Sequence, residues 1–250
     1  MKRILAFGDS FVVGDLDDFG PNDPAKNHNP QFPPTHGMNY DTRLKYVMNN
    51  VSFVSLIAKD FNCPLINLAG RGSGNYQQLD NLLEFIEEKG IQPGDVILFG
   101  ITSTIRDRID QPNPPPPNRH SIFNKHIAVK GYVDRFDLFY ILSTLDVVSR
   151  TYNVPIIKFN IFDNAVYDPL KNIKFNFDNY LGQGLKANTL INILNDDWGQ
   201  DIPRPVFHTS IKPKADYEQY YTWNRHPSEL GHRKIADWFL KNVDWEQLNT

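Results

Sequence analysis

The sequence predicts an α/β protein in which a parallel sheet is covered by helices on both faces. Short apolar runs alternate with longer segments of helical period, and this alternation is typical of parallel sheets. The runs at 4–7 and 96–101 are almost wholly apolar, as expected for strands that are buried on both sides. No repeat of fixed period and no linker between two cores is visible. We therefore expect one elaborated domain over residues 1–250.

The elements follow one another in a regular order. Strands are expected at 4–7, 64–68, 96–101 and 155–161, and helices at 51–61, 75–88, 136–152 and 227–243. Each helix has apolar residues spaced three and four apart, such as Leu79, Leu82 and Ile86 in the second. Residues 15–40 have no such period and predict a long loop, and the proline-rich residues 111–118 predict a stiff surface segment. Residues 163–222 are weakly periodic, and no element is assigned there.

Composition excludes several classes of protein. With 250 residues, 40% of them hydrophobic, the chain can bury a sizeable core, and global disorder is excluded. A net charge of −3 gives no basic footprint for nucleic acid, and a single cysteine, Cys63, excludes an internal disulfide. No apolar stretch is long enough to span a membrane, and Gly8 interrupts the N-terminus before a signal-peptide core forms. We expect a soluble cytoplasmic protein with no membrane partner; its 25 asparagines indicate an A+T-rich coding sequence, bacterial or viral.

Chemically useful side chains follow the predicted strands. Ser10 follows the first strand, the glycine-rich residues 70–75 follow the second, and Thr102 follows the third, while His226 precedes the last helix. The carboxyl ends of parallel strands meet at one edge of a sheet, where ligands bind. A serine hydroxyl needs a base to become a nucleophile, and an imidazole titrates near neutrality. A glycine turn lets a backbone N–H approach a developing oxyanion.

Each of these residues also has a structural explanation. Ser10 suits a helix N-cap, the glycines suit a tight turn, and Thr102 suits the backbone groups at a strand end. His226 suits a surface histidine before a Pro-Ser helix start. Taken singly, these explanations are at least as good as the functional ones. In this order and at these strand ends, the four together favour catalysis.

The same segments resemble the ordered blocks of the SGNH (GDSL-type) hydrolase superfamily. The matching residues are Phe7-Gly8-Asp9-Ser10, then Asn67-Leu68-Ala69 with Gly72, and finally His226-Pro227-Ser228 with Gly231-His232. The third block departs from the family, which has Gly-x-Asn where this chain has Gly100-Ile101-Thr102. The resemblance leaves out insertions near 15–50, 106–133 and 163–222. It implies a three-layer α/β/α, flavodoxin-like fold with a mostly parallel five-stranded sheet and neither metal nor other cofactor.

The resemblance also implies a serine ester hydrolase with defined residue roles. Ser10 would be the nucleophile, and His226 would be its base and then the acid for the leaving group. The backbone N–H groups of Ser10 and Gly72 would bind the oxyanion, with Thr102 in place of the family's asparagine. One such donor is worth about 10²–10³ in rate.

The third member of the triad departs from the family pattern. The family usually has an aspartate three residues before the histidine, where this chain has Trp223, and Asn224 follows it. An asparagine oxygen accepts an imidazole N–H but brings no charge. The alternatives are a Ser–His dyad oriented by a backbone carbonyl, or a carboxylate from Asp163, Asp168 or Asp216. The missing carboxylate also supports a second hypothesis, a catalytically decayed SGNH-fold module that binds carbohydrate.

Aromatic residues near the histidine suggest a substrate. Tyr217, Tyr220, Tyr221 and Trp223 precede His226, and flat rings stack on sugars or pack against the sheet edge equally well. We take Tyr221, Trp223 and Asn75 as substrate-binding candidates and a small acyl group, such as acetyl, on a carbohydrate as the substrate. A nucleotide site is the third hypothesis, but Asn75 breaks the Gly-x-Gly-x-x-Gly pattern. His232 lies on another helical face from His226, so it is expected to pack or cap rather than to bind a metal.

Overall fold

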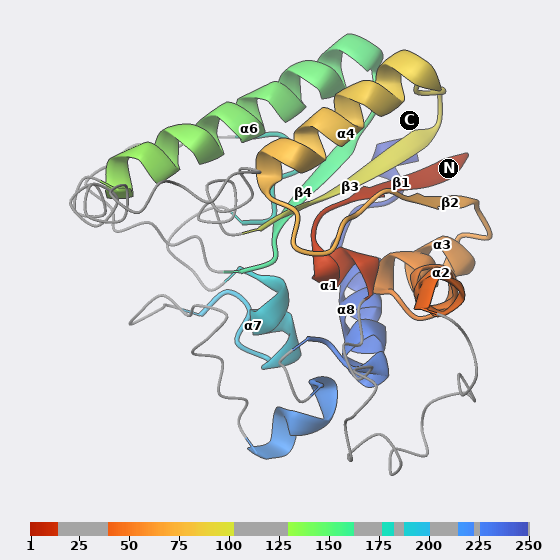
Figure 1. The fold of residues 1–250 in the computed structure, drawn as a ribbon, viewed down its shortest axis with the longest axis vertical. Helices are drawn as coiled ribbons and strands as arrows, with labels where there is room; N and C mark the ends of the chain where they lie inside the picture. Colours follow the sequence, from red (N-terminus) through yellow and green to blue (C-terminus); the bar gives the residue numbers. More distant parts are fainter. Residues whose placement is uncertain are drawn as a thin grey trace.

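A parallel sheet lies between two groups of helices (Figure 1). The computed structural model describes residues 1–14, 40–102, 130–162, 177–182, 188–200, 215–222 and 226–249. The strands are β1 (Arg3–Phe7), β2 (Leu65–Asn67), β3 (Asp95–Ile101) and β4 (Ile156–Asn160), in the spatial order β2-β1-β3-β4. Every neighbouring pair is parallel. The predicted α/β class is therefore confirmed.

The helices of the described residues have these bounds: α1 (Ser10–Val13), α2 (Tyr40–Asn50), α3 (Phe53–Asp60), α4 (Asn75–Glu88), α6 (Lys130–Tyr152), α7 (Leu190–Leu194), α8 (Glu229–Asn242), and the 3-10 helices η4 (Ala215–Tyr220) and η5 (Gln247–Asn249). Helices α4 and α6 cover one face of the sheet, and α1, α3 and α8 lie on the other (Figure 1). No helix in these segments is both long enough and apolar enough to cross a membrane.

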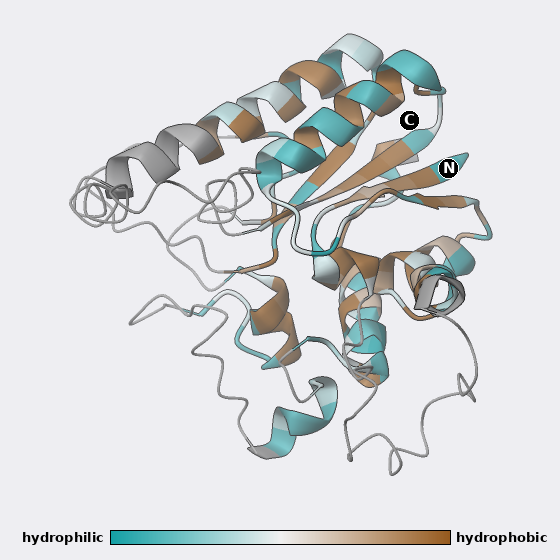
Figure 2. Ribbon diagram, viewed as in Figure 1, coloured by the Kyte–Doolittle hydropathy of each residue, from teal (hydrophilic) through white to brown (hydrophobic). Residues whose placement is uncertain are grey.

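The two faces of the sheet build two apolar cores, because side chains alternate along each strand. Leu5, Ile97 and Phe99 point toward α4 and α6, whereas Ile4 and Leu98 point toward α3 and α8. Figure 2 shows the strands as largely hydrophobic, whereas α4 carries both hydrophilic and hydrophobic residues. This double burial explains why the strands appear in the sequence as continuous apolar runs.

Most predicted elements are confirmed, and the differences have local causes. The helix predicted at 75–88 has those bounds, and the one predicted from 51 begins at Phe53 because the Ser52 hydroxyl caps it. The helix predicted at 136–152 begins earlier, at Lys130. Helices α1 and α2 were not predicted, and α7 and η4 lie in the stretch where no element was assigned. The loop predicted at 15–40 and the proline-rich residues 111–118 lie almost wholly outside the described residues.

The described sheet has four strands, whereas five were expected. Short segments lie where a fifth strand would pair with β4. Lys158 and Tyr180 form an isolated parallel bridge, and so do Asn160 and Thr189. The Leu181 N–H donates to the Lys158 carbonyl at 2.8 Å. These bridges satisfy part of the β4 edge without forming a regular strand.

A buried ion pair joins β4 to helix α6. The ammonium of Lys158, which is fully buried, lies 2.5 Å from a carboxylate oxygen of Asp146 and also contacts the carbonyl of Asp178. Burial lowers the pKa of Lys158, and the hydrogen bond that Lys158 donates to Asp146 opposes that shift. The ion pair therefore offsets the cost of placing a charged side chain in the core beneath α6.

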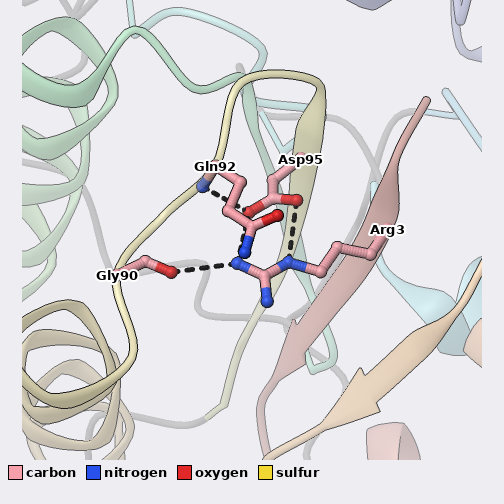
Figure 3. A network of polar contacts seen from close by, with 4 residues as sticks. All are labelled: Arg3, Gly90, Gln92 and Asp95. Atoms are coloured by element: carbon pink, nitrogen blue, oxygen red, sulfur yellow. Dashed lines mark hydrogen bonds and ion pairs between the residues drawn. The ribbon is translucent and has the colours of Figure 1, made fainter.

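A second polar network fastens the amino ends of β1 and β3, at the edge of the sheet opposite to Ser10 (Figure 3). The guanidinium of Arg3 binds both carboxylate oxygens of Asp95, at 2.9 and 2.8 Å, and the carbonyl of Gly90 at 2.9 Å. The Gln92 N–H donates to the same carboxylate at 2.7 Å. The Asp95 side chain is fully buried, so each of its contacts replaces water.

We expect Arg3→Lys to lower the free energy of unfolding by about 1–2 kcal/mol, because a lysine ammonium cannot make the same fork of hydrogen bonds. Urea unfolding measures the effect. The control is Arg233→Lys on the exposed surface of α8, which should change stability by less than about 0.5 kcal/mol. Equal stabilities of the Arg3 variant and the wild type would contradict this account.

Candidate active site

Ser10 lies at the point where β1 turns into helix α1. The Asp9 side chain is the N-cap of α1 and accepts the Phe11 N–H at 2.9 Å, so Ser10 is the first residue of the helix rather than its cap. Gly8 has φ +150°, and a Cβ there would lie 2.4 Å from a methyl carbon of Val12. The turn therefore requires glycine at position 8. It leaves Ser10 5% exposed at the carboxyl edge of the sheet.

His226 reaches Ser10 from the other end of the chain. The Oγ of Ser10 and the Nε2 of His226 are 2.8 Å apart, across 216 residues of sequence. His226 is buried, and its ring lies against that of Phe11, with centroids 5.0 Å apart and planes tilted by 39°. Phe11 in turn makes an edge contact with Phe162, which follows β4. The two side chains that the sequence places at one edge of the sheet are therefore in hydrogen-bond contact.

The start of α8 determines where His226 lies. Ser228 is the N-cap, as the predicted Pro-Ser helix start requires, and its hydroxyl accepts the Gly231 N–H at 3.1 Å. A Cβ on Gly231 would lie 2.2 Å from the carbonyl oxygen of Tyr220. Only glycine allows this close approach between α8 and the preceding segment. This contact gives a physical reason for Gly231 in the matched motif.

The glycine-rich turn after β2 is bound to the turn that carries Ser10. The amide of Gln78 connects them: its oxygen accepts the Gly8 N–H at 2.9 Å, and its nitrogen donates to Ser73 Oγ at 2.8 Å. The Gly70 N–H donates to the Gly8 carbonyl at 3.0 Å. Sequence analysis missed Gln78, because a glutamine inside a predicted helix gives no signal of a contact with another turn.

The two predicted oxyanion donors are backbone groups of Ser10 and Gly72. Gly72 has φ +71° and is exposed, and a Cβ there would meet nothing within 4 Å. Within the described segments, the N–H groups of Ser10 and Gly72 donate to no protein acceptor. Both are therefore available to a ligand. Their roles in an oxyanion hole stay predictions.

We expect Gly72→Ala to slow hydrolysis of an aryl acetate by about 10- to 100-fold, because a side chain at positive φ shifts the peptide that would donate to the oxyanion. Gly90→Ala is the matched control, since Gly90 has φ +72° and equally open space but lies beyond the end of α4. Both variants should lose about 1 kcal/mol of stability. Equal activities in the two variants would remove Gly72 from the site.

Thr102 and Asn75 bond to neighbouring protein groups, and their predicted roles stay predictions. The Thr102 hydroxyl donates its single proton to the second carboxylate oxygen of Asp9 at 2.7 Å, so it offers no donor to an oxyanion in this structure. The Asn75 side chain is buried and makes two hydrogen bonds to the backbone of Thr102. Its amide oxygen accepts the Thr102 N–H at 2.9 Å, and its amide nitrogen donates to the Thr102 carbonyl at 3.1 Å. This geometry favours a role for Asn75 in holding the end of β3 over contact with a substrate.

The aromatic candidates are mostly engaged with protein groups. The Tyr221 hydroxyl donates to the side-chain oxygen of Asn195 at 2.9 Å, and the ring belongs to the core under α8. The rings of Tyr217 and Tyr220 face the ammonium of Lys234, at 4.8 and 4.3 Å from the ring centroids. These contacts favour packing over sugar stacking for all three tyrosines.

The third triad member is not identified. Trp223, Asn224, Asp163 and Asp168 lie outside the described residues. Asp216 is exposed on η4, and none of the hydrogen bonds among the described residues joins its carboxylate to His226. Asn224 and the alternative acids therefore stay predictions.

His232 packs inside the core, as expected, where burial disfavours its charged form. It is fully buried, its Nδ1 accepts the Phe53 N–H at 3.3 Å, and its ring stacks on the Phe53 ring. Among the described residues, its Nε2 has no hydrogen-bond partner. Burial, with a smaller contribution from the charge of His226, lowers the pKa of His232 from its ordinary 6.5 to about 3. His232 is therefore neutral near pH 7.

The chain is similar to solved structures, of which two are described here. No protein-family model matches the chain, and no curated protein matches it. One solved structure is a protein of the lipolytic G-D-S-L family from Desulfitobacterium hafniense DCB-2, 12% identical, with 95% of this chain and 97% of that one covered and a TM-score of 0.43. Another is a member of the lipolytic protein G-D-S-L family from Veillonella parvula DSM 2008, 13% identical, with 97% and 98% covered and a TM-score of 0.39.

Proposed function

We propose that this protein is a serine hydrolase that cleaves esters, with Ser10 as the nucleophile and His226 as the base. One observation carries the proposal: the 2.8 Å contact between Ser10 Oγ and His226 Nε2. This is the contact through which an imidazole removes the proton of a hydroxyl nucleophile. The N–H groups of Ser10 and Gly72 also support the proposal, because neither has a hydrogen-bond acceptor among the described residues.

The proposed reaction has two steps. Ser10 Oγ attacks the ester carbonyl carbon while its proton passes to His226 Nε2, and the carbonyl oxygen becomes an oxyanion near the N–H groups of Ser10 and Gly72. When the C–O bond to the alcohol breaks, His226 gives its proton to the leaving oxygen. A water molecule then loses a proton to His226 and attacks the acyl-serine. As the bond between the acyl carbon and Ser10 Oγ breaks, His226 returns that proton to Oγ, which releases the carboxylic acid and restores the Ser10 hydroxyl.

This reaction fixes the tautomer of His226. Nε2 must be the unprotonated nitrogen in the free protein, so Nδ1 carries the proton and needs an acceptor. We propose the Asn224 side-chain oxygen or a backbone carbonyl for that position. Either orients the ring but brings less stabilisation to the imidazolium than a carboxylate does. The proposal therefore predicts a slower enzyme than one with a complete triad.

The substrate class is proposed as a small acyl ester, such as an acetyl ester, on a carbohydrate. Of the aromatic candidates, Trp223 is left as the proposed sugar-stacking residue, since the three tyrosines have protein contacts. We expect Trp223→Ala to reduce activity on acetylated sugars by about tenfold and activity on an aryl acetate much less, because stacking on a ring contributes about 1 kcal/mol or more. An equal fall on both substrates would exclude sugar binding by Trp223.

A serine-reactive phosphonate probe tests the proposed function without knowledge of the natural substrate. The wild type should be labelled at Ser10, with the site found by peptide mass analysis, and Ser10→Ala should not be labelled. Ser73→Ala is the control, because Ser73 is also buried at this edge but bonds to the carbonyls of Gly8 and Gly70. No labelling of folded wild type would contradict the hydrolase and support the decayed binding module instead.

A further inference from the structure

The backbone of His226 is held by one neighbouring residue, Thr222. The Thr222 N–H donates to the carbonyl oxygen of His226 at 2.7 Å, and the Thr222 hydroxyl lies 3.2 Å from that same oxygen. The N–H of His226 donates back to the hydroxyl oxygen at 3.2 Å. Thr222 is buried, with 6% of its surface exposed, so these bonds are shielded from water.

The contact belongs to a short antiparallel pairing that leads into α8. Tyr221 and Pro227 form an antiparallel bridge, and the Ser228 N–H donates to the carbonyl of Tyr220 at 2.9 Å. The Ser228 hydroxyl donates to the carbonyl of Gln219 at 2.6 Å while it caps α8. His226 is therefore fixed between this pairing and the helix, and in the described residues Thr222 is the side chain that bonds to both of its peptide groups.

We propose that Thr222 is a positioning residue, which holds the peptide of His226 so that its Nε2 stays directed at Ser10 Oγ. This inference rests on the proposed function. A hydroxyl is suited to the task because it donates and accepts at once, and so serves an N–H and a carbonyl together. None of the hydrogen bonds among the described residues joins Thr222 to Ser10, so the effect of Thr222 passes through His226.

The proposed proton transfer depends on the short distance between Ser10 Oγ and His226 Nε2. At 2.8 Å the two atoms are within hydrogen-bond distance, and a displacement of 1 Å would break the contact. Such a displacement typically costs up to about 10²-fold in rate. In the resembled family a carboxylate orients the histidine ring, but this chain has Trp223 and Asn224 at those positions. The orientation of the His226 ring therefore depends more on how its backbone is held.

The test compares three variants by their rate of labelling with the phosphonate probe and by thermal unfolding. Thr222→Val keeps the shape of the side chain but removes its hydroxyl, and Thr222→Ser keeps the hydroxyl. Thr189→Val is the matched control, because Thr189 is also buried and its hydroxyl bonds to Asn192 at the start of α7. We expect Thr222→Val to label at least about tenfold more slowly than the wild type, and the other two within about threefold of it.

The pH profile separates positioning from general loss of structure. Labelling by Thr222→Val should depend on pH as it does in the wild type but reach a lower plateau, because the imidazole itself is unchanged and lies less often against Ser10. Equal labelling rates in Thr222→Val and wild type would overturn the proposal, as would equal slowing in Thr189→Val. If Thr222→Val does not fold, Thr222→Ala, which also lacks the hydroxyl, replaces it. Absence of labelling in the wild type itself would instead contradict the proposed function.

Discussion

Replacing His226 with glutamine is expected to lower the hydrolysis of an aryl acetate by about 10⁴-fold or more. A glutamine at this position still reaches toward Ser10 with a hydrogen-bonding group, so the local packing is retained. An amide does not accept a proton near neutral pH, and Ser10 then has no base. Activity measured from pH 5 to 9 should stay low throughout, because the amide supplies no base at any of these pH values.

The matched control for this variant is His232→Gln. His232 lies on the same C-terminal segment and is also buried, but its Nδ1 contacts the Phe53 N–H instead of Ser10. We expect His232→Gln to keep activity within a few-fold of the wild type. If His226→Gln keeps its activity, or if the two variants lose it equally, the Ser10–His226 contact is not the catalytic pair.

The sequence predicts the sheet and its main helices because their signals are local. A strand buried on both faces is a continuous apolar run, and a helix of 14 residues such as α4 repeats its apolar positions often enough to be recognised. Helix α1 has four residues, too few for any period to appear. The fifth strand was expected from the family resemblance alone, and the isolated bridges at Lys158 and Asn160 stand in its place.

The candidate site was predictable only in part, because its residues differ in what determines them. Ser10 and His226 follow from their positions at strand and helix ends, which the chain order already indicates. The roles of Thr102 and Asn75 depend on which partner lies nearest: the Thr102 hydroxyl meets the Asp9 carboxylate, and the Asn75 amide meets the Thr102 peptide. Such choices depend on distances of a few tenths of an ångström between separate strands. A one-dimensional pattern does not contain that information.

The same distinction explains Asp9. Its identity was visible in the Gly8-Asp9-Ser10 motif, and aspartate is a favoured N-cap residue. The structure adds that its carboxylate is fully buried, with one oxygen on the Phe11 N–H and the other on the Thr102 hydroxyl. Asp9 therefore ties the nucleophile turn to the end of β3. The rigidity of Ser10 in the proposed mechanism depends on this tie.

His232 leads to the second large effect, on stability as a function of pH. Its pKa is about 3 in the folded protein and about 6.5 in the unfolded chain, so between these values the unfolded chain binds a proton that the folded protein does not. Stability is therefore lost as pH falls below 6.5. The loss due to this residue is about 2–3 kcal/mol between pH 6 and pH 4.

The variant His232→Gln removes this contribution, because glutamine does not titrate in either the folded protein or the unfolded chain. Urea unfolding at pH 6, 5 and 4 gives the free energy of unfolding of each protein, and the variant should gain about 2–3 kcal/mol relative to the wild type across that range. The gain has the opposite sign to that expected for a histidine stabilised by a carboxylate, whose pKa would be raised. A constant difference between the two proteins from pH 6 to pH 4 would mean that the folded protein protonates His232 as readily as the unfolded chain does. The unpartnered Nε2 inside the core would then have to reach water, contrary to its full burial beside Phe53.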